Sequence, residues 1–79
     1  SPLSVWQQTA TLLAANEGVF DKVPVESIKK AQDALLNNLR SAHKKTMEVL
    51  DKGDKPDEKT KETILKSAKE IAKEYTVNG

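Results

Sequence analysis

Cysteine is absent from this 79-residue chain, and tryptophan, tyrosine and phenylalanine occur once each. Without cysteine, the chain cannot form a disulfide framework, a thiolate zinc site or a cysteine nucleophile. With so few aromatic residues, the core has to be built from aliphatic side chains, which suits packing between helices better than a β-sandwich. These absences favour an all-α domain and exclude thiol redox chemistry.

Long apolar runs and a surplus of one charge are also missing. No stretch approaches the roughly 20 apolar residues that a bilayer span needs, and no signal-peptide pattern is present. Thirteen basic and twelve acidic residues leave a formal charge of +1, so no net field attracts the chain to nucleic acid or to an anionic membrane. We therefore expect no nucleic-acid partner and no direct membrane insertion.

The length and the 37% hydrophobic content fit a single helical domain over residues 1–79. This size is close to the limit at which one hydrophobic core outweighs chain entropy. We therefore expect the domain to gain stability from neighbouring protein. An interface left without its natural neighbour would also allow the chain to self-associate.

A first helix is predicted from Ser4 to Glu17. Ser4 followed by Gln7 fits a capping box, and Gly18 can adopt the left-handed conformation that ends many helices. The apolar spacing brings four side chains near one face of this helix: Val5, Trp6, Leu12 and Leu13. The short run 19–23 is predicted to form an ordered turn.

Further helices are predicted at Val25–Ala42 and His43–Asp51, because Pro24 favours a first turn and apolar residues recur beyond it. One continuous helix through residues 41–44 fits the same pattern. The run 51–57 contains Gly53 and Pro56 and predicts a loop. A last helix is predicted from Asp57 to Tyr75, with either Asp57 or Asp54 as its N-cap. The expected fold is thus a small bundle of about four helices.

The sequence gives little support for chemistry. His43 is the only histidine, and an isolated imidazole is weak evidence for a catalytic base or a metal ligand. Asp51, Asp54 and Asp57 do not follow the spacing of a calcium loop, and no phosphate-binding glycine loop is present. We therefore predict no catalytic, cofactor-binding or metal site. Trp6 is the candidate interface or core residue, since tryptophan is common in both settings.

The order and spacing of these elements resemble one family. The residues that carry the resemblance run from the N-terminus to the middle of the chain: Pro2, Leu3, Ser4, Val5, Gln7, Gln8, Leu12, Leu13, Ala14, Ala15, Gly18, Asp21, Ile28, Ala34, Leu35, Leu36, His43 and Met47. They are similar to the C-terminal helical domain of the α subunit of F-type ATP synthase. The resemblance covers essentially the whole chain.

Five positions depart from the family pattern. Phe20 stands where leucine is usual and Val19 where tyrosine is usual, and three further departures fall on predicted helices. Ala31 stands where phenylalanine is usual, Asn38 where an aromatic residue is common, and Thr46 where leucine is common. A lost core phenylalanine leaves a void that costs several kcal/mol unless neighbours fill it. Either Phe20 or Trp6 compensates, or the packing differs.

The resemblance implies a structural and mechanical role. ATP and magnesium would be bound by the nucleotide-binding domain of the full subunit, which these residues do not include, so the chain itself would catalyse nothing. It would pack between β subunits, border the central rotor stalk and lie peripherally on the cytoplasmic face of the inner membrane, or on the equivalent organelle membrane face. By analogy, the corner between the first two helices would face the rotor, with Glu17, Asp21, Lys22 and Glu26 as its charged residues.

Two other functions are compatible with the sequence. One is an independent helical module that grips a partner protein through a helix face. The other is a small enzyme or nucleotide binder, which the lack of convergent Ser/His/Asp, metal-ligand or phosphate-loop residues disfavours.

Overall fold

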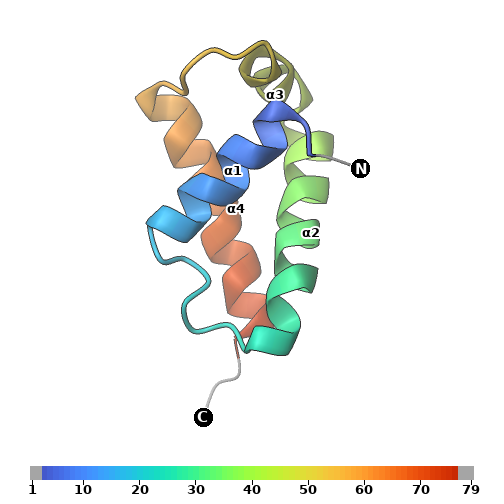
Figure 1. Cartoon of the computed structure of the whole chain (residues 1–79), viewed down its shortest axis with the longest axis vertical. Coiled ribbons are helices and arrows are strands. Elements are labelled where there is room, and N and C mark those ends of the chain that lie inside the picture. The colour runs from blue at the N-terminus through green and yellow to red at the C-terminus, as the bar shows by residue number, and fades with distance from the viewer. Residues whose placement is uncertain (1–2, 77–79) are drawn as a thin grey trace.

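A computed structural model describes residues 3–76 and contains four helices. They are α1 (Val5–Asn16), α2 (Val25–Ala42), α3 (Lys44–Asp51) and α4 (Glu58–Tyr75), and no strand occurs in residues 3–76 (Figure 1). The predicted all-α fold and the four predicted helices are confirmed, with helix ends that agree to within a residue.

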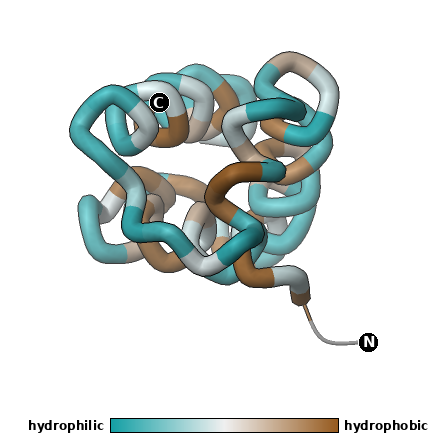
Figure 2. Tube along the Cα trace, turned by 90° about the horizontal axis from the view of Figure 1, so that it is seen from above, coloured by the Kyte–Doolittle hydropathy of each residue, from teal (hydrophilic) through white to brown (hydrophobic). Residues whose placement is uncertain are grey.

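The two long helices, α2 and α4, form the most extensive contact in the bundle, and α1 lies across them (Figure 1). The short helix α3 closes one end of a body measuring 40 × 29 × 21 Å. Hydrophilic residues cover much of the outer surface when the bundle is viewed from that end (Figure 2). The most deeply buried large side chains lie on α2 and α4: Leu35, Leu39 and Ile64.

Helix α1 begins and ends as local rules predict, but its buried face differs from the expected one. The Ser4 backbone N–H donates to Gln7 Oε1 at 2.8 Å, as in a capping box. The buried side chains follow a four-residue spacing: Trp6, Ala10 and Ala14. Val5 and Leu12 are instead 47% and 61% exposed. Small alanine side chains allow close approach between helices, so the buried stripe contains Ala10 and Ala14 and leaves Val5 and Leu12 outside it.

The junction at His43 is a break between two helices. Its backbone angles, φ −131° and ψ 41°, leave the helical region, although its N–H still bonds to Leu39 O and its C=O accepts from Met47 N–H, both at 3.0 Å. The new direction lets α3 bury Met47 and Leu50, which are 2% and 3% exposed. The structure thus decides in favour of two helices over one continuous helix.

The three helical positions that depart from the family pattern have different environments. Ala31 is completely buried, whereas Asn38 is exposed and Thr46 is half-buried. Only Ala31 therefore stands where a smaller side chain alters the core directly. The polar side chains of Asn38 and Thr46 remain in reach of solvent.

Helix α4 begins at a charged N-cap. The Asp57 carboxylate accepts from the Thr60 backbone N–H at 2.7 Å. This hydrogen bond favours the ionised form and lowers the pKa of Asp57 below its ordinary value of 3.8. Lys61 forms its ion pair with Glu58, at 3.6 Å. The Asp57 carboxylate instead caps the first turn of the helix.

Replacing Asp57 with asparagine is expected to change how stability depends on pH. A carboxyl whose pKa is lowered by folding stabilises the folded state above its unfolded pKa, and this contribution disappears as the pH falls through the folded pKa. Asparagine is a comparable N-cap without a titrating group. Thermal unfolding between about pH 6 and about pH 2 should therefore show a smaller acid loss in Asp57→Asn than in the unmodified chain. Identical pH profiles would contradict the assignment.

Candidate functional site at the helix corner

The chain turns from α1 to α2 at an ordered corner, defined here as residues 17–27, which consists of the connecting segment 17–24 and the first residues of α2, 25–27. Gly18 has a left-handed backbone with φ 66°, and the Val19 N–H returns to Ala14 O at 3.0 Å. Phe20 and Val23 are 7% and 4% exposed, which fixes the segment against the core. The prediction of an ordered turn is confirmed, and the corner holds its charged residues on a rigid support.

Four charged side chains predicted as partner-facing lie on this corner: Glu17, Asp21, Lys22 and Glu26. All four are exposed. Within residues 3–76 the ion pairs closer than 4.0 Å are Lys29–Asp33 and Lys61–Glu58, so none involves the corner. Exposed charges without an internal partner can meet another molecule without a large desolvation cost.

The corner also has a defined position in the bundle. It lies at the end of the long axis opposite α3 and the start of α1, beside the last turns of α4 (Figure 1). The start of α1 and the charged corner are therefore at opposite ends of the bundle.

Replacing Gly18 with alanine is expected to destabilise the domain by about 1–2 kcal/mol, because an L-residue is strained in the left-handed region. A Cβ at this position would also lie 2.7 Å from Asp21 Oδ2. Gly53 has a φ of 97°, and a Cβ added there would have no other atom within 4 Å, so Gly53→Ala measures backbone strain alone. Because 97° lies farther than 66° from the left-handed minimum, chemical denaturation should give a loss for Gly53→Ala at least as large as that for Gly18→Ala. A clearly larger loss for Gly18→Ala would show that displacing the exposed Asp21 side chain is costly.

Trp6 lies in the core at 9% exposed, and it lines a surface pocket together with Met47 and Asp51 of α3. Its backbone N–H donates to Asp51 Oδ1 at 3.2 Å, so a side chain at the end of α3 caps the first turn of α1. The Arg40 guanidinium stands 5.8 Å from the centre of the Trp6 ring, within cation–π range. Sequence reasoning missed Asp51 and Arg40, since no local pattern links them to Trp6.

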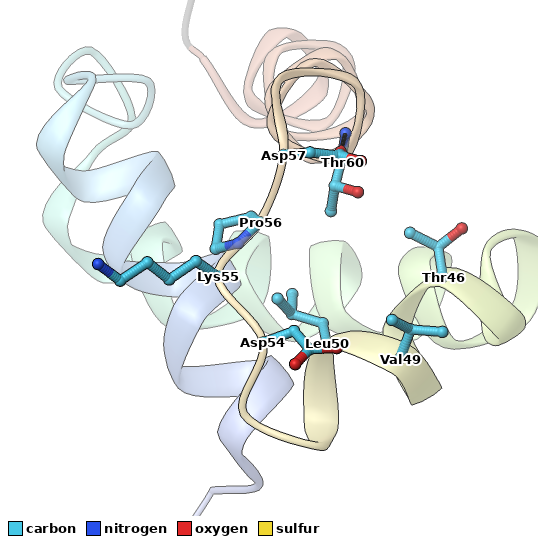
Figure 3. Close-up of a pocket in the computed structure, with 8 residues that line it drawn as sticks. All are labelled: Thr46, Val49, Leu50, Asp54, Lys55, Pro56, Asp57 and Thr60. Atoms are coloured by element: carbon cyan, nitrogen blue, oxygen red, sulfur yellow. Dashed lines mark hydrogen bonds between the residues drawn. The ribbon is translucent and has the colours of Figure 1, made fainter.

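A surface pocket of about 350 Å³ lies between α3, the following loop and the start of α4 (Figure 3). Its polar side chains include Thr46, Asp54 and Thr60, together with Asp57, which already caps α4. In the figure, the Lys55 side chain points away from the others. Among residues 3–76, no group of three or more His, Cys, Asp or Glu side chains could hold a metal ion.

Comparison with known proteins supports the same family as the resemblance and the helical fold. Residues 1–71 match the family described as ATP synthase alpha/beta chain, C terminal domain. The chain belongs to this family. The ATP synthase resemblance and the helical-bundle fold predicted from the sequence are thereby confirmed.

The similar curated proteins are subunits of ATP synthase. ATP synthase subunit alpha of Methylobacillus flagellatus is 38% identical over 74 residues, which cover 87% of this chain and 14% of that protein. The same subunit of Corynebacterium glutamicum is 32% identical over 71 residues, or 90% and 13%. That of Corynebacterium aurimucosum is 28% identical over 75 residues, or 95% and 14%. No solved structure gives a significant match.

This ATP synthase domain therefore covers only about 14% of the length of the relatives that it matches. Within residues 3–76, none of its helices is both long and apolar enough to cross a membrane.

Proposed function

We propose that the chain is the C-terminal helical domain of an ATP synthase α subunit, and that it acts structurally and mechanically. In this role the domain packs against adjacent β subunits and borders the central rotor stalk during proton-driven ATP synthesis. ATP and magnesium are bound by another part of the subunit. The match of residues 1–71 to the ATP synthase family carries the proposal.

The position of the corner supports a contact with a moving partner. In a full subunit, the rest of the protein would precede α1, and the corner lies at the far end of the bundle (Figure 1). Its exposed charges have no internal ion pair in the described residues, and Phe20 and Val23 hold it rigidly. A rigid charged surface can transmit force to a stalk that turns against it and still release its contacts, because each exposed pair is weak.

Exposed apolar side chains support packing against neighbouring subunits. On and just before α1, Leu3, Val5 and Leu12 are 45%, 47% and 61% exposed. Val25 at the start of α2 is 86% exposed. Complete burial of a fully exposed Val or Leu side chain contributes about 1.5–3 kcal/mol, and side chains that are already half-buried contribute correspondingly less. In the complete ATP synthase, we assign these side chains to contacts with β subunits. The part of the enzyme that contains this domain lies peripherally on the membrane face.

A domain exchange tests this function. The matching segment of the Methylobacillus flagellatus subunit alpha is replaced by this chain, and assembly is measured by native electrophoresis of the complete ATP synthase. We expect the exchanged subunit to enter the complex, because the domain supplies equivalent surfaces. The same exchange carrying Leu35→Ala is the matched control and should assemble poorly. A folded exchanged subunit that stays outside the complex would favour an independent interaction module instead.

A further inference from the structure

A groove runs between the corner and the last turns of α4, on the side of the corner that faces this helix. It has a volume of about 610 Å³. Its charged lining consists of Lys22 and Asp21 from the corner and Lys69 and Lys73 from α4. Three lysines against one aspartate leave the lining with a net charge of +2.

In the described part of the chain, no carboxylate forms an ion pair with the lysines of this groove. The ion pairs closer than 4.0 Å in residues 3–76 involve other lysines, namely Lys29 and Lys61. Lys22, Lys69 and Lys73 are all exposed. The groove therefore keeps like charges close together without neutralising them, which favours an anionic ligand.

The spacing of the basic residues matches a helix. Lys66, Lys69 and Lys73 follow one another at steps of three and four residues, so they share one face of α4. Lys66, Lys69 and Lys73 also line a second hollow toward the start of α4, together with Glu62 and Glu70, so the lining of this hollow carries a net charge of +1. Carboxylates at helical spacing on a partner could pair with successive lysines along this line.

The floor of the groove is partly apolar. Val19 and Ala72 line it between the lysines, and Val19 remains half-buried. An amphipathic helix carries both apolar and charged side chains, so it can contact both parts of this lining. A free phosphate would interact with the lysines alone.

We propose that this groove, defined by Val19, Lys22, Lys69, Ala72 and Lys73, binds an acidic amphipathic helix of a neighbouring subunit. The proposal deepens the proposed function and rests on it for the biological source of the helix. The partner's carboxylates pair with the lysines, and its apolar residues contact Val19 and Ala72.

The test uses the full 79-residue chain and a synthetic amphipathic helical peptide with glutamates at positions i, i+4 and i+7. Binding is followed by fluorescence anisotropy and by backbone NMR shifts. We expect shifts to concentrate in residues 18–22 and 66–76. Replacing the peptide glutamates with glutamine should remove most of the binding.

The variant carrying Lys22→Gln, Lys69→Gln and Lys73→Gln is expected to bind the acidic peptide about tenfold more weakly, since each exposed pair contributes a few-fold. The matched control carries Lys30→Gln, Lys45→Gln and Lys52→Gln, which makes the same change in net charge on exposed residues elsewhere. Its affinity should stay within about twofold. Circular dichroism checks the helix content of both variants, and the single variant Lys69→Gln replaces the triple variant if folding is lost.

Equal weakening in the two triple variants would overturn the proposal, because general charge attraction would then explain the binding. Absence of peptide binding would overturn it as well. Equally strong competition by single-stranded RNA or by vesicles containing phosphatidylserine would show a general anion surface and reject a helix-specific groove. None of these results depends on the domain exchange, so failure of this proposal is distinguishable from failure of the proposed function.

Discussion

Replacing Leu35 with alanine is expected to lower the free energy of unfolding by about 2–5 kcal/mol. Leu35 lies on α2 and is completely buried, and α2 forms the most extensive helix contact of the bundle with α4. Removing its terminal carbon atoms loses apolar burial and leaves a cavity. A domain of this size has a stability of only about 4–12 kcal/mol, so the variant should lose a large share of that stability.

Leu12→Ala is the matched control for this prediction. It makes the same chemical change on α1, at a side chain that is 61% exposed. Exposed positions usually change stability by no more than about 0.5 kcal/mol. Urea denaturation followed by circular dichroism should therefore separate the two variants clearly. Similar losses at both positions would contradict the burial pattern of the bundle.

Local sequence rules predicted the helix ends well. A capping pair at Ser4 and Gln7, a left-handed Gly18 and an N-cap at Asp57 each act through atoms within a few residues. Such signals can be recognised from the sequence because neighbouring residues alone satisfy the first amides or the last carbonyls of a helix. The four-helix fold followed from these ends and from the apolar periodicity between them.

The buried face of α1 could not be predicted in the same way. Ala10 and Ala14 are completely buried, although larger apolar residues occur elsewhere on the helix. Which face is buried depends on how closely α1 approaches the helices beneath it, and alanine permits a close approach. Val5 and Leu12 consequently remain exposed, a result that hydrophobicity alone does not predict.

Contacts between distant segments account for the other features that the sequence did not indicate. Asp51 caps the start of α1 across 45 residues, and the groove joins Lys22 of the corner to Lys69 and Lys73 of α4. The corner charges themselves were predicted from the segment and the family resemblance. Their proximity to the lysines of α4 depends on tertiary packing, so no local spacing could reveal it.

Replacing Glu17, Asp21 and Glu26 with alanine in the complete ATP synthase is expected to reduce the coupling of ATP turnover to proton transport. These carboxylates are exposed on the corner, where we propose that they meet the central stalk. Three exposed charge contacts contribute about 0.6–3 kcal/mol in total, enough to weaken the corner–stalk contact about 3- to 150-fold. Nucleotide binding should persist, because the proposed nucleotide site lies in another part of the subunit.

The matched control replaces Glu48, Asp54 and Glu58 with alanine. These carboxylates are also exposed, and they lie on or next to α3 and the start of α4, at the end of the bundle away from the corner. The same number of negative charges is removed, so a general charge effect would alter both variants equally.

Proton transport per ATP hydrolysed, measured with the assembled enzyme in sealed vesicles, tests the mechanical role of the domain most directly. A lower ratio for the corner variant, with an unchanged ratio for the control, is the expected result. An unchanged ratio in the corner variant would contradict a role for these residues in coupling to the rotor.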